Sequence, residues 1–151
     1  DSVIAVSPPY MAVEGVIVTA TFEDNSTRYT RDGYNSAQLV NNSNNIEAAI
    51  IYVKDKLKRG RPVIIGVHYT NGTSTPPNNN NRATRHFMII VGIGTLDDKL
   101  YFRFYDPGRS LANAANATSP ENILVVDKES GKVEGNYYNR TYSLTEIVKT
   151  Y

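Results

Sequence analysis

Two apolar runs that flank a short polar turn constrain this chain more than any other feature of its sequence. The runs cover residues 86–93 and 100–106, and "GTLDD" separates them, which is the pattern expected of an antiparallel β-hairpin. A third run, "RPVIIGVHY" at residues 61–69, is rich in β-branched side chains without polar alternation. Such a run is typical of a strand that is buried on both faces. The sequence therefore predicts an antiparallel sheet with a buried central strand.

The clearest helix directly precedes the buried strand. Asn44 is its expected N-cap, Glu47 completes a capping box, and Gly60 provides the stop signal. We therefore predict a helix close to residues 45–58 that packs on the sheet. The apolar face of this helix consists of Ile46, Ile50, Val53 and Leu57.

The remaining segments complete the predicted fold. Residues 16–31 alternate apolar and polar side chains on either side of "EDNS", which predicts two strands around a turn, and residues 121–138 predict another hairpin that turns at Ser130-Gly131. The segment "SLTEIVKTY" opens with a possible capping box, Ser143 to Glu146, which favours a C-terminal helix. No repeat or linker divides the chain. We expect one domain over residues 1–151, of class α+β, with an antiparallel sheet and a packed helix.

The composition argues against several classes of partner. The formal net charge is +1, and the longest basic stretch is "KDKLKRGR", so no nucleic-acid partner is expected. No apolar run approaches the roughly 18 residues of a membrane span. The two histidines lack an HExxH spacing and a carboxylate cluster, so we expect no metal site and no cofactor. His68 shares a strand face with Ile64 and Gly66, which favours a buried, hydrogen-bonded histidine.

His86 and Asp106 occupy the two open ends of the predicted hairpin. A loop over residues 94–98, centred on Leu96, pairs His86 with Asp106, Met88 with Phe104, Ile90 with Phe102 and Gly92 with Leu100. Directly opposed residues have Cβ atoms ~5 Å apart, so the carboxylate can accept a hydrogen bond from the imidazole. That bond selects one tautomer and leaves the other ring nitrogen free to act as a base. The alternative is a polar pair, or two independent loop residues, without a chemical role.

The segments around this pair resemble the papain-like cysteine peptidases, most closely their C39-like branch. The matching residues are "AAIIYVKDKLKRGRPVIIGVHY" at 48–69 and "HFMIIVGIG" with "YFRFYDPG" between 86 and 108. The resemblance implies a papain-like fold and hydrolysis of peptide or amide bonds. It also implies that His86 is the general base and that Asp106 orients it. Tyr69, Tyr101 and Tyr105 are candidates for lining a peptide-binding groove.

The chain departs from that family because it contains no cysteine. In the family, a cysteine at the start of an upstream helix is the nucleophile. The cysteine could lie on an N-terminal segment or second chain separate from these residues, which start at Asp1 rather than Met, so that the domain would lack its nucleophile helix. It could instead be replaced by serine, with Ser26 as the first candidate and Ser36 as the weaker one. The glutamine that binds the oxyanion precedes the nucleophile in this family, whereas the only glutamine here, Gln38, follows both serines. The domain could also be a pseudoenzyme that only binds.

These observations lead to one main expectation and two alternatives. The main expectation is a papain-like cysteine peptidase or amidase domain that acts on a peptide or on peptidoglycan and is inactive without a thiol. A bacterial secreted protease or a toxin effector would fit, with a secreted or extracytoplasmic location and an inhibitor or immunity protein as a further partner. The first alternative is an inactive papain-like domain that holds a peptide or protein partner through its groove or the Asn-rich loop at residues 70–82. The second is an interaction domain unrelated to peptidases.

Overall fold

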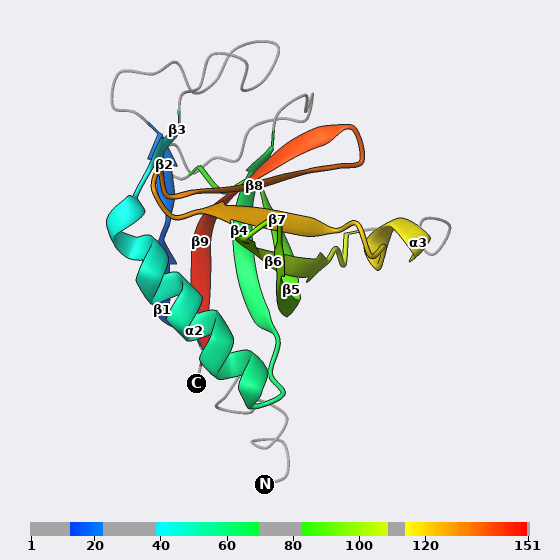
Figure 1. Ribbon diagram of the computed structural model, residues 1–151, viewed down its shortest axis with the longest axis horizontal. Helices are drawn as coiled ribbons and strands as arrows, with labels where there is room; N and C mark the ends of the chain where they lie inside the picture. Colours follow the sequence, from blue (N-terminus) through cyan, green and yellow to red (C-terminus); the bar gives the residue numbers. More distant parts are fainter. Residues whose placement is uncertain (1–12, 23–38, 70–82, 109–113, 151) are drawn as a thin grey trace, which may run out of the picture.

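The computed structural model describes residues 13–22, 39–69, 83–108 and 114–150 (Figure 1). The first elements are β1 (Val13–Val18), β2 (Ala20–Phe22), β3 (Leu39–Asn41), the 3-10 turn η2 (Ser43–Asn45) and α2 (Ile46–Lys58). They are followed by β4 (Val63–Tyr69), β5 (His86–Leu96), β6 (Lys99–Tyr105) and the short α3 (Ala114–Ala117). The last elements are β7 (Ile123–Asp127), β8 (Lys132–Tyr137) and β9 (Arg140–Thr150).

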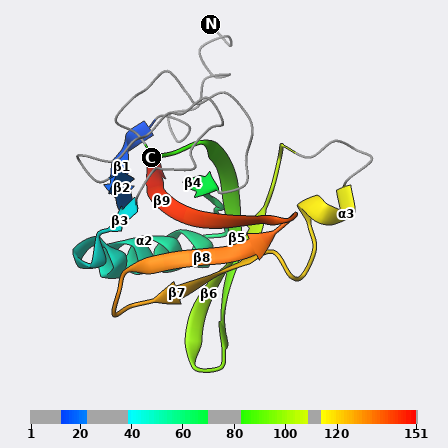
Figure 2. The same ribbon diagram turned by 90° about the horizontal axis from the view of Figure 1, so that it is seen from above.

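Six of these strands close into one antiparallel barrel. The order around it is β9, β4, β5, β6, β7 and β8, and β8 pairs again with β9. The first part of β9 pairs with β8, and β1 pairs with the last part of β9, where β8 has ended. Strands β2 and β3 form a separate small sheet. Figure 2 shows the long β9 bending between these partners.

The predicted fold class, a papain-like α+β structure, is therefore wrong. The described chain is mostly β, and its sheet is closed, with α2 as the one described helix longer than a single turn. The physical reason is the length and curvature of β9, because a single strand of 11 residues reaches β4, β8 and β1. One extra residue, Thr145, bulges between the pairs Gly66–Glu146 and Val67–Leu144, and a bulge bends the strand that carries it.

The helix expected at the C-terminus is also wrong, since the segment from Ser143 onward belongs to β9. The prediction rested on the capping-box pattern of Ser143 and Glu146, a local signal that does not decide between a helix and a strand. The segment is extended because it pairs with β8, β4 and β1. Within it, the bulged Thr145 shifts the alternation by one residue, so that Leu144 and Ile147, three residues apart, both enter the core.

The predicted helix over residues 45–58 is confirmed as α2. Four of its apolar side chains enter the barrel core, and these are Ile46, Ala49, Ile50 and Val53. Leu57 is only partly buried. The N-cap is Asn45 rather than Asn44, and its side-chain amide donates to the carbonyl oxygen of Val18 at 2.7 Å, with no side-chain capping bond. After the helix, Gly60 has a φ of 73°, the left-handed conformation that favours glycine at this position.

The β5–β6 hairpin exists, but its predicted register is wrong. The turn is the two-residue Asp97-Asp98, with φ values of 51° and 66°, which matches the twist of tight hairpins. Leu96 pairs with Lys99 as the last residue of its strand and is not the centre of a loop. Ile90 pairs with Phe104 rather than Phe102, because the shorter turn moves the register by three residues and the bulge at Val91 takes back one. The tip of this hairpin projects beyond the other described strands (Figure 2).

Of the two other predicted hairpins, one is confirmed and the other lies partly outside the described residues. The hairpin turning at Ser130-Gly131 is confirmed by the β7–β8 pairing. In its turn, the backbone amides of Ser130 and Glu129 hold the pKa of Asp127 below its usual value. The first strand predicted within residues 16–31 corresponds to β1 and β2, whereas the second lies outside the described residues. β2 instead pairs with β3.

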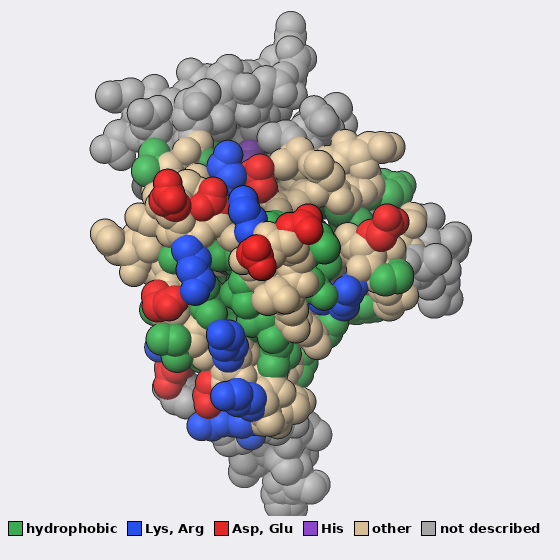
Figure 3. All heavy atoms as spheres, viewed as in Figure 1, with side chains coloured by type: hydrophobic (Ala, Val, Ile, Leu, Met, Phe, Trp, Pro, Cys, Tyr) green, Lys and Arg blue, Asp and Glu red, His purple; other side chains and the backbone are tan. Residues whose placement is uncertain are grey.

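Large apolar side chains fill the barrel. The largest of the fully buried side chains are those of Tyr142, Phe102, Phe104, Ile65, Met88, Ile90, Leu124, Leu144 and Ile147. On the face shown in Figure 3, basic and acidic side chains are interspersed among hydrophobic ones, without a patch of one sign in the described part. No described helix is long and apolar enough to cross a membrane.

Candidate active site

The candidate site lies at one mouth of the barrel. Antiparallel order brings the ends of β4, β6 and β8 together with the starts of β5, β7 and β9. His86 is the first residue of β5, opposite Val67 of β4, and Asp106 directly follows β6. This mouth therefore contains both residues that the sequence singled out.

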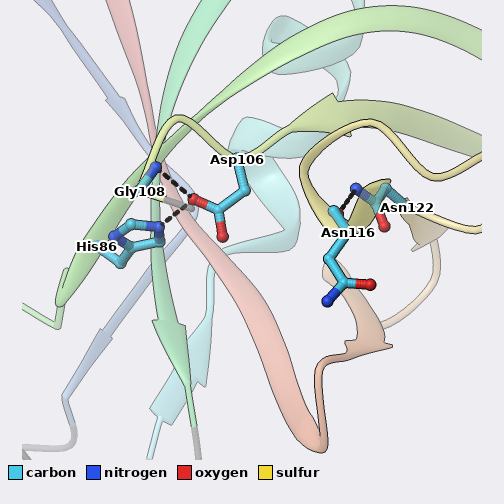
Figure 4. Close-up of polar contacts among 5 residues, drawn as sticks. All are labelled: His86, Asp106, Gly108, Asn116 and Asn122. Atoms are coloured by element: carbon cyan, nitrogen blue, oxygen red, sulfur yellow. Dashed lines mark hydrogen bonds and ion pairs between the residues drawn. The ribbon is translucent and has the colours of Figure 1, made fainter. Parts of the chain in front are cut away.

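His86 and Asp106 form the predicted contact. The Nε2 atom of His86 lies 2.8 Å from Oδ1 of Asp106 (Figure 4). The same carboxylate oxygen accepts a hydrogen bond from the backbone amide of Gly108 at 2.9 Å. The Asp106 side chain is 1% exposed and that of His86 is 29% exposed. Asp106 is therefore a buried carboxylate that accepts two hydrogen bonds, and it holds an imidazole that remains accessible from the mouth.

The contact forms although the predicted register was wrong. At Ile90 the observed partner is Phe104 instead of Phe102, a shift of two residues. Because side chains alternate with a period of two, this even shift keeps the residues between that pair and the mouth on their predicted faces. Between the bulge and the turn the shift is three residues, so there the predicted faces are wrong, and Gly92 pairs with Arg103 instead of Leu100. Asp106 therefore reaches His86 diagonally along the inner face instead of directly across the pair.

The geometry assigns the tautomer of His86. A carboxylate only accepts hydrogen bonds, so the ring proton shared with Asp106 resides on Nε2. In the neutral ring, Nδ1 then carries a lone pair, and no described residue is bonded to it. This arrangement suits a general base, because Nδ1 is free to accept a proton while the carboxylate of Asp106 orients the ring through Nε2.

Gly108 is a site residue that the sequence analysis quoted without assigning it a role. A Cβ atom at this position would lie 2.8 Å from Cε1 of His86 and 3.2 Å from Oδ1 of Asp106. Glycine therefore leaves the space in which the imidazole meets the carboxylate. The signal was present in the Asp-Pro-Gly motif, because an aspartate often accepts the amide two residues ahead of it in a turn.

The tyrosines proposed to line a groove lie in different environments. Tyr69, at the end of β4, is 8% exposed, and the guanidinium carbons of Arg85 and Arg140 lie 4.3 Å from its ring centroid. Tyr105 is 36% exposed and precedes Asp106, so it points to the opposite face of its strand. Tyr101 is half-buried in the same strand. The three rings therefore differ in burial and in the face of the sheet they occupy, and their role in substrate binding stays a prediction. Ser26 and Ser36 lie outside the described residues.

His68 is buried, as its strand position predicts. It is 4% exposed, its Nδ1 lies 3.3 Å from the carbonyl oxygen of Ala83, and its ring packs edge-on against Phe22. Burial lowers the pKa of His68 to about 4; the bond to Ala83 opposes this shift, and the charge of Arg85 adds to it. His68 is therefore a neutral structural residue at ordinary pH. The described residues contain no group of three or more side chains suited to hold a metal ion.

A mostly β domain with a buried aspartate that orients a histidine at a barrel mouth is compatible with hydrolytic chemistry, and the family comparison agrees. Residues 9–145 match the Peptidase_C39 like family. Because the match covers most of the chain, the protein belongs to this family and is a peptidase-related domain. No curated protein and no solved structure matches the chain.

Proposed function

We propose that this domain hydrolyses peptide or amide bonds, with His86 as general base and acid and Asp106 as the group that orients it. The observation that carries the proposal is the bond between Nε2 of His86 and the buried carboxylate of Asp106, at 2.8 Å. Membership in a peptidase-related family supports the same conclusion.

The proposed reaction follows from the free Nδ1 atom. Nδ1 removes the proton of a thiol, and the thiolate attacks the carbonyl carbon of the scissile amide. The imidazolium, stabilised by Asp106, then gives this proton to the departing amine. Water, deprotonated in the same way, attacks the resulting thioester and releases the acid and the thiol. His86 thus accepts and returns one proton in each half of the reaction.

The thiol has to come from outside the 151 residues, because they contain no cysteine. We propose that a further segment or a second chain brings it to the barrel mouth beside His86. Peptides and peptidoglycan are the substrates that this chemistry fits, and a secreted or extracytoplasmic location suits both. The chain by itself should show no thiol-dependent turnover.

The absence of cysteine also favours a second candidate function. A non-catalytic member of the family could use the barrel mouth to hold a peptide or a protein partner. In that case the His86–Asp106 bond would serve only to close the end of the barrel. The two functions differ in whether removal of the imidazole affects chemistry or only binding.

Turnover of peptide and peptidoglycan substrates distinguishes these functions. Where the coding sequence continues upstream of Asp1, the longer protein should be assayed beside its His86→Ala and Asp106→Asn variants. We expect His86→Ala to abolish turnover and Asp106→Asn to weaken it through loss of orientation. Equal activity in the unmodified protein and His86→Ala would remove His86 from the mechanism. A longer protein that binds peptide without cleaving it would favour the binding function.

A second experiment asks whether Ser26 stands where the thiol belongs. Ser26→Cys and its matched control Ser36→Cys each introduce one thiol, and alkylation by iodoacetamide reports thiolate formation. If the thiol comes from outside, neither rate should change when His86→Ala is added. A rate for Ser26→Cys that exceeds the control and falls with His86→Ala would place the nucleophile in this chain instead.

A further inference from the structure

We propose that Asn122 is a positioning residue for the His86–Asp106 pair, an inference that rests on the proposed function. Asn122 lies between the short α3 and β7 and is 1% exposed. Its side-chain Nδ2 donates to the backbone carbonyl oxygen of Asn116 at 2.8 Å (Figure 4). One buried amide thereby closes the turn over residues 116–122.

That turn holds the end of β6. Regular pairing between β6 and β7 ends at Arg103 and Ile123. Beyond it, the amide of Phe104 donates to the carbonyl oxygen of Asn122 at 3.0 Å, and the amide of Asp106 donates to that of Ala117 at 3.1 Å. The backbone of Asp106 is therefore fixed by the turn and not by a neighbouring strand.

The position of the turn sets the direction of the carboxylate. Asp106 has its backbone bonded to Ala117 on one side, and its side chain bonds Gly108 and His86 on the other. If the turn opens, the backbone anchor of Asp106 is lost and its carboxylate is no longer held toward Nε2. Through Asp106, the turn between α3 and β7 thus determines the orientation of the imidazole.

Only a side chain that donates a hydrogen bond can fill this role at position 122. The partner is a backbone carbonyl, which accepts only. An aspartate has nearly the same shape as asparagine, but when ionised it offers no donor and places a negative charge against the carbonyl oxygen. At a pH at which the new carboxyl group is ionised, Asn122→Asp therefore removes the bond while it preserves the volume of the side chain.

The experiment compares Asn122→Asp with Asn136→Asp, an exposed asparagine on β8. Long-range proton–nitrogen NMR reports the tautomer of His86, and the two-histidine composition keeps the spectrum simple. We expect Asn122→Asp to reduce the population protonated at Nε2 and to speed amide exchange at Asp106 by roughly tenfold or more, as expected from loss of an anchoring bond. The buried methyl signals of Leu124 and the spectrum of Asn136→Asp should stay unchanged.

An unchanged tautomer and unchanged Asp106 exchange in a folded Asn122→Asp variant would overturn the inference. If that variant does not fold, exchange in the unmodified protein decides the matter: we expect the Asp106 amide to be protected, and exchange as fast as that of an exposed loop amide would refute the link to Ala117. None of these measurements involves turnover. Failure of the proposed function appears only in the His86→Ala assay, so the two failures are distinguishable.

Discussion

Replacement of Gly108 by alanine should break the His86–Asp106 bond without disturbing the barrel core. The added methyl group would lie 2.8 Å from Cε1 of His86 and 3.4 Å from its Nε2. Non-bonded carbon atoms prefer separations of ~3.5–4.0 Å, so the ring has to move by roughly 0.7–1.2 Å. Gly108 has no left-handed φ, and alanine therefore adds no backbone strain at this position.

The size of the effect follows from that displacement. The Nε2–Oδ1 distance is 2.8 Å, and a shift of that size along the bond would take it to ~3.5 Å, beyond the usual range of a hydrogen bond. A bond to a charged partner contributes about 1.5–3 kcal/mol. Because His86 is 29% exposed and water can replace part of the loss, we expect Gly108→Ala to reduce the free energy of unfolding by ~1–2 kcal/mol.

A double-mutant cycle in urea tests the cause of this loss. Gly108→Ala should cost ~1–2 kcal/mol in the unmodified protein and close to nothing in a His86→Ala background, since the methyl group then meets no ring. Gly92→Ala is the matched control, because its Cβ would meet Arg103 at an ordinary 3.5 Å. Equal costs for Gly108→Ala with and without the His86 ring would refute the steric argument.

Three further predictions concern stability and are checked by urea denaturation. Ile50→Ala should cost about 2–5 kcal/mol because Ile50 is 2% exposed, whereas Ile51→Ala, at a position 62% exposed, should cost far less; equal costs would contradict the packing of α2. Leu57→Ala should fall between them, since Leu57 is only partly buried. His68→Phe tests how stability depends on pH. The pKa of His68 is lowered to about 4 in the folded protein, so as the pH falls below 6.5 the unfolded protein takes up a proton that the folded protein does not. The free energy of unfolding therefore declines from pH 6.5 toward pH 4. We expect the unmodified protein to lose about 3 kcal/mol more than His68→Phe over that interval, and parallel pH profiles would refute this account.

Local patterns in the sequence predicted local structure well. The spacing of Ile46, Ile50 and Val53 identified α2 because a single helix face is set by neighbouring residues. The contact between His86 and Asp106 was also found, for a partly wrong reason. From Ile90 to the mouth the register error is two residues, which conserves the faces of His86 and Asp106. Between the bulge and the turn the error is three residues, and the predicted faces are wrong there.

Closure of the barrel could not be predicted because it depends on two bulges and a distant pairing. Val91 and Thr145 each add one residue to a strand, and no composition signal marks either position. The turn at Asp97-Asp98 was missed because left-handed turns favour glycine or asparagine, whereas here two aspartates adopt positive φ. Asn122 was missed because its role arises only when the turn after α3 folds against β6.

The protonation of the two imidazoles in the unmodified protein tests the central claim most directly. Long-range proton–nitrogen NMR above pH 7 distinguishes a ring protonated on Nε2 from one protonated on Nδ1. The structure predicts opposite tautomers: His86 protonated on Nε2, toward Asp106, and His68 protonated on Nδ1, toward the carbonyl of Ala83. In Asp106→Asn the preference of His86 should weaken while that of His68 remains. A His86 ring protonated on Nδ1 in the unmodified protein would contradict its assignment as an oriented base.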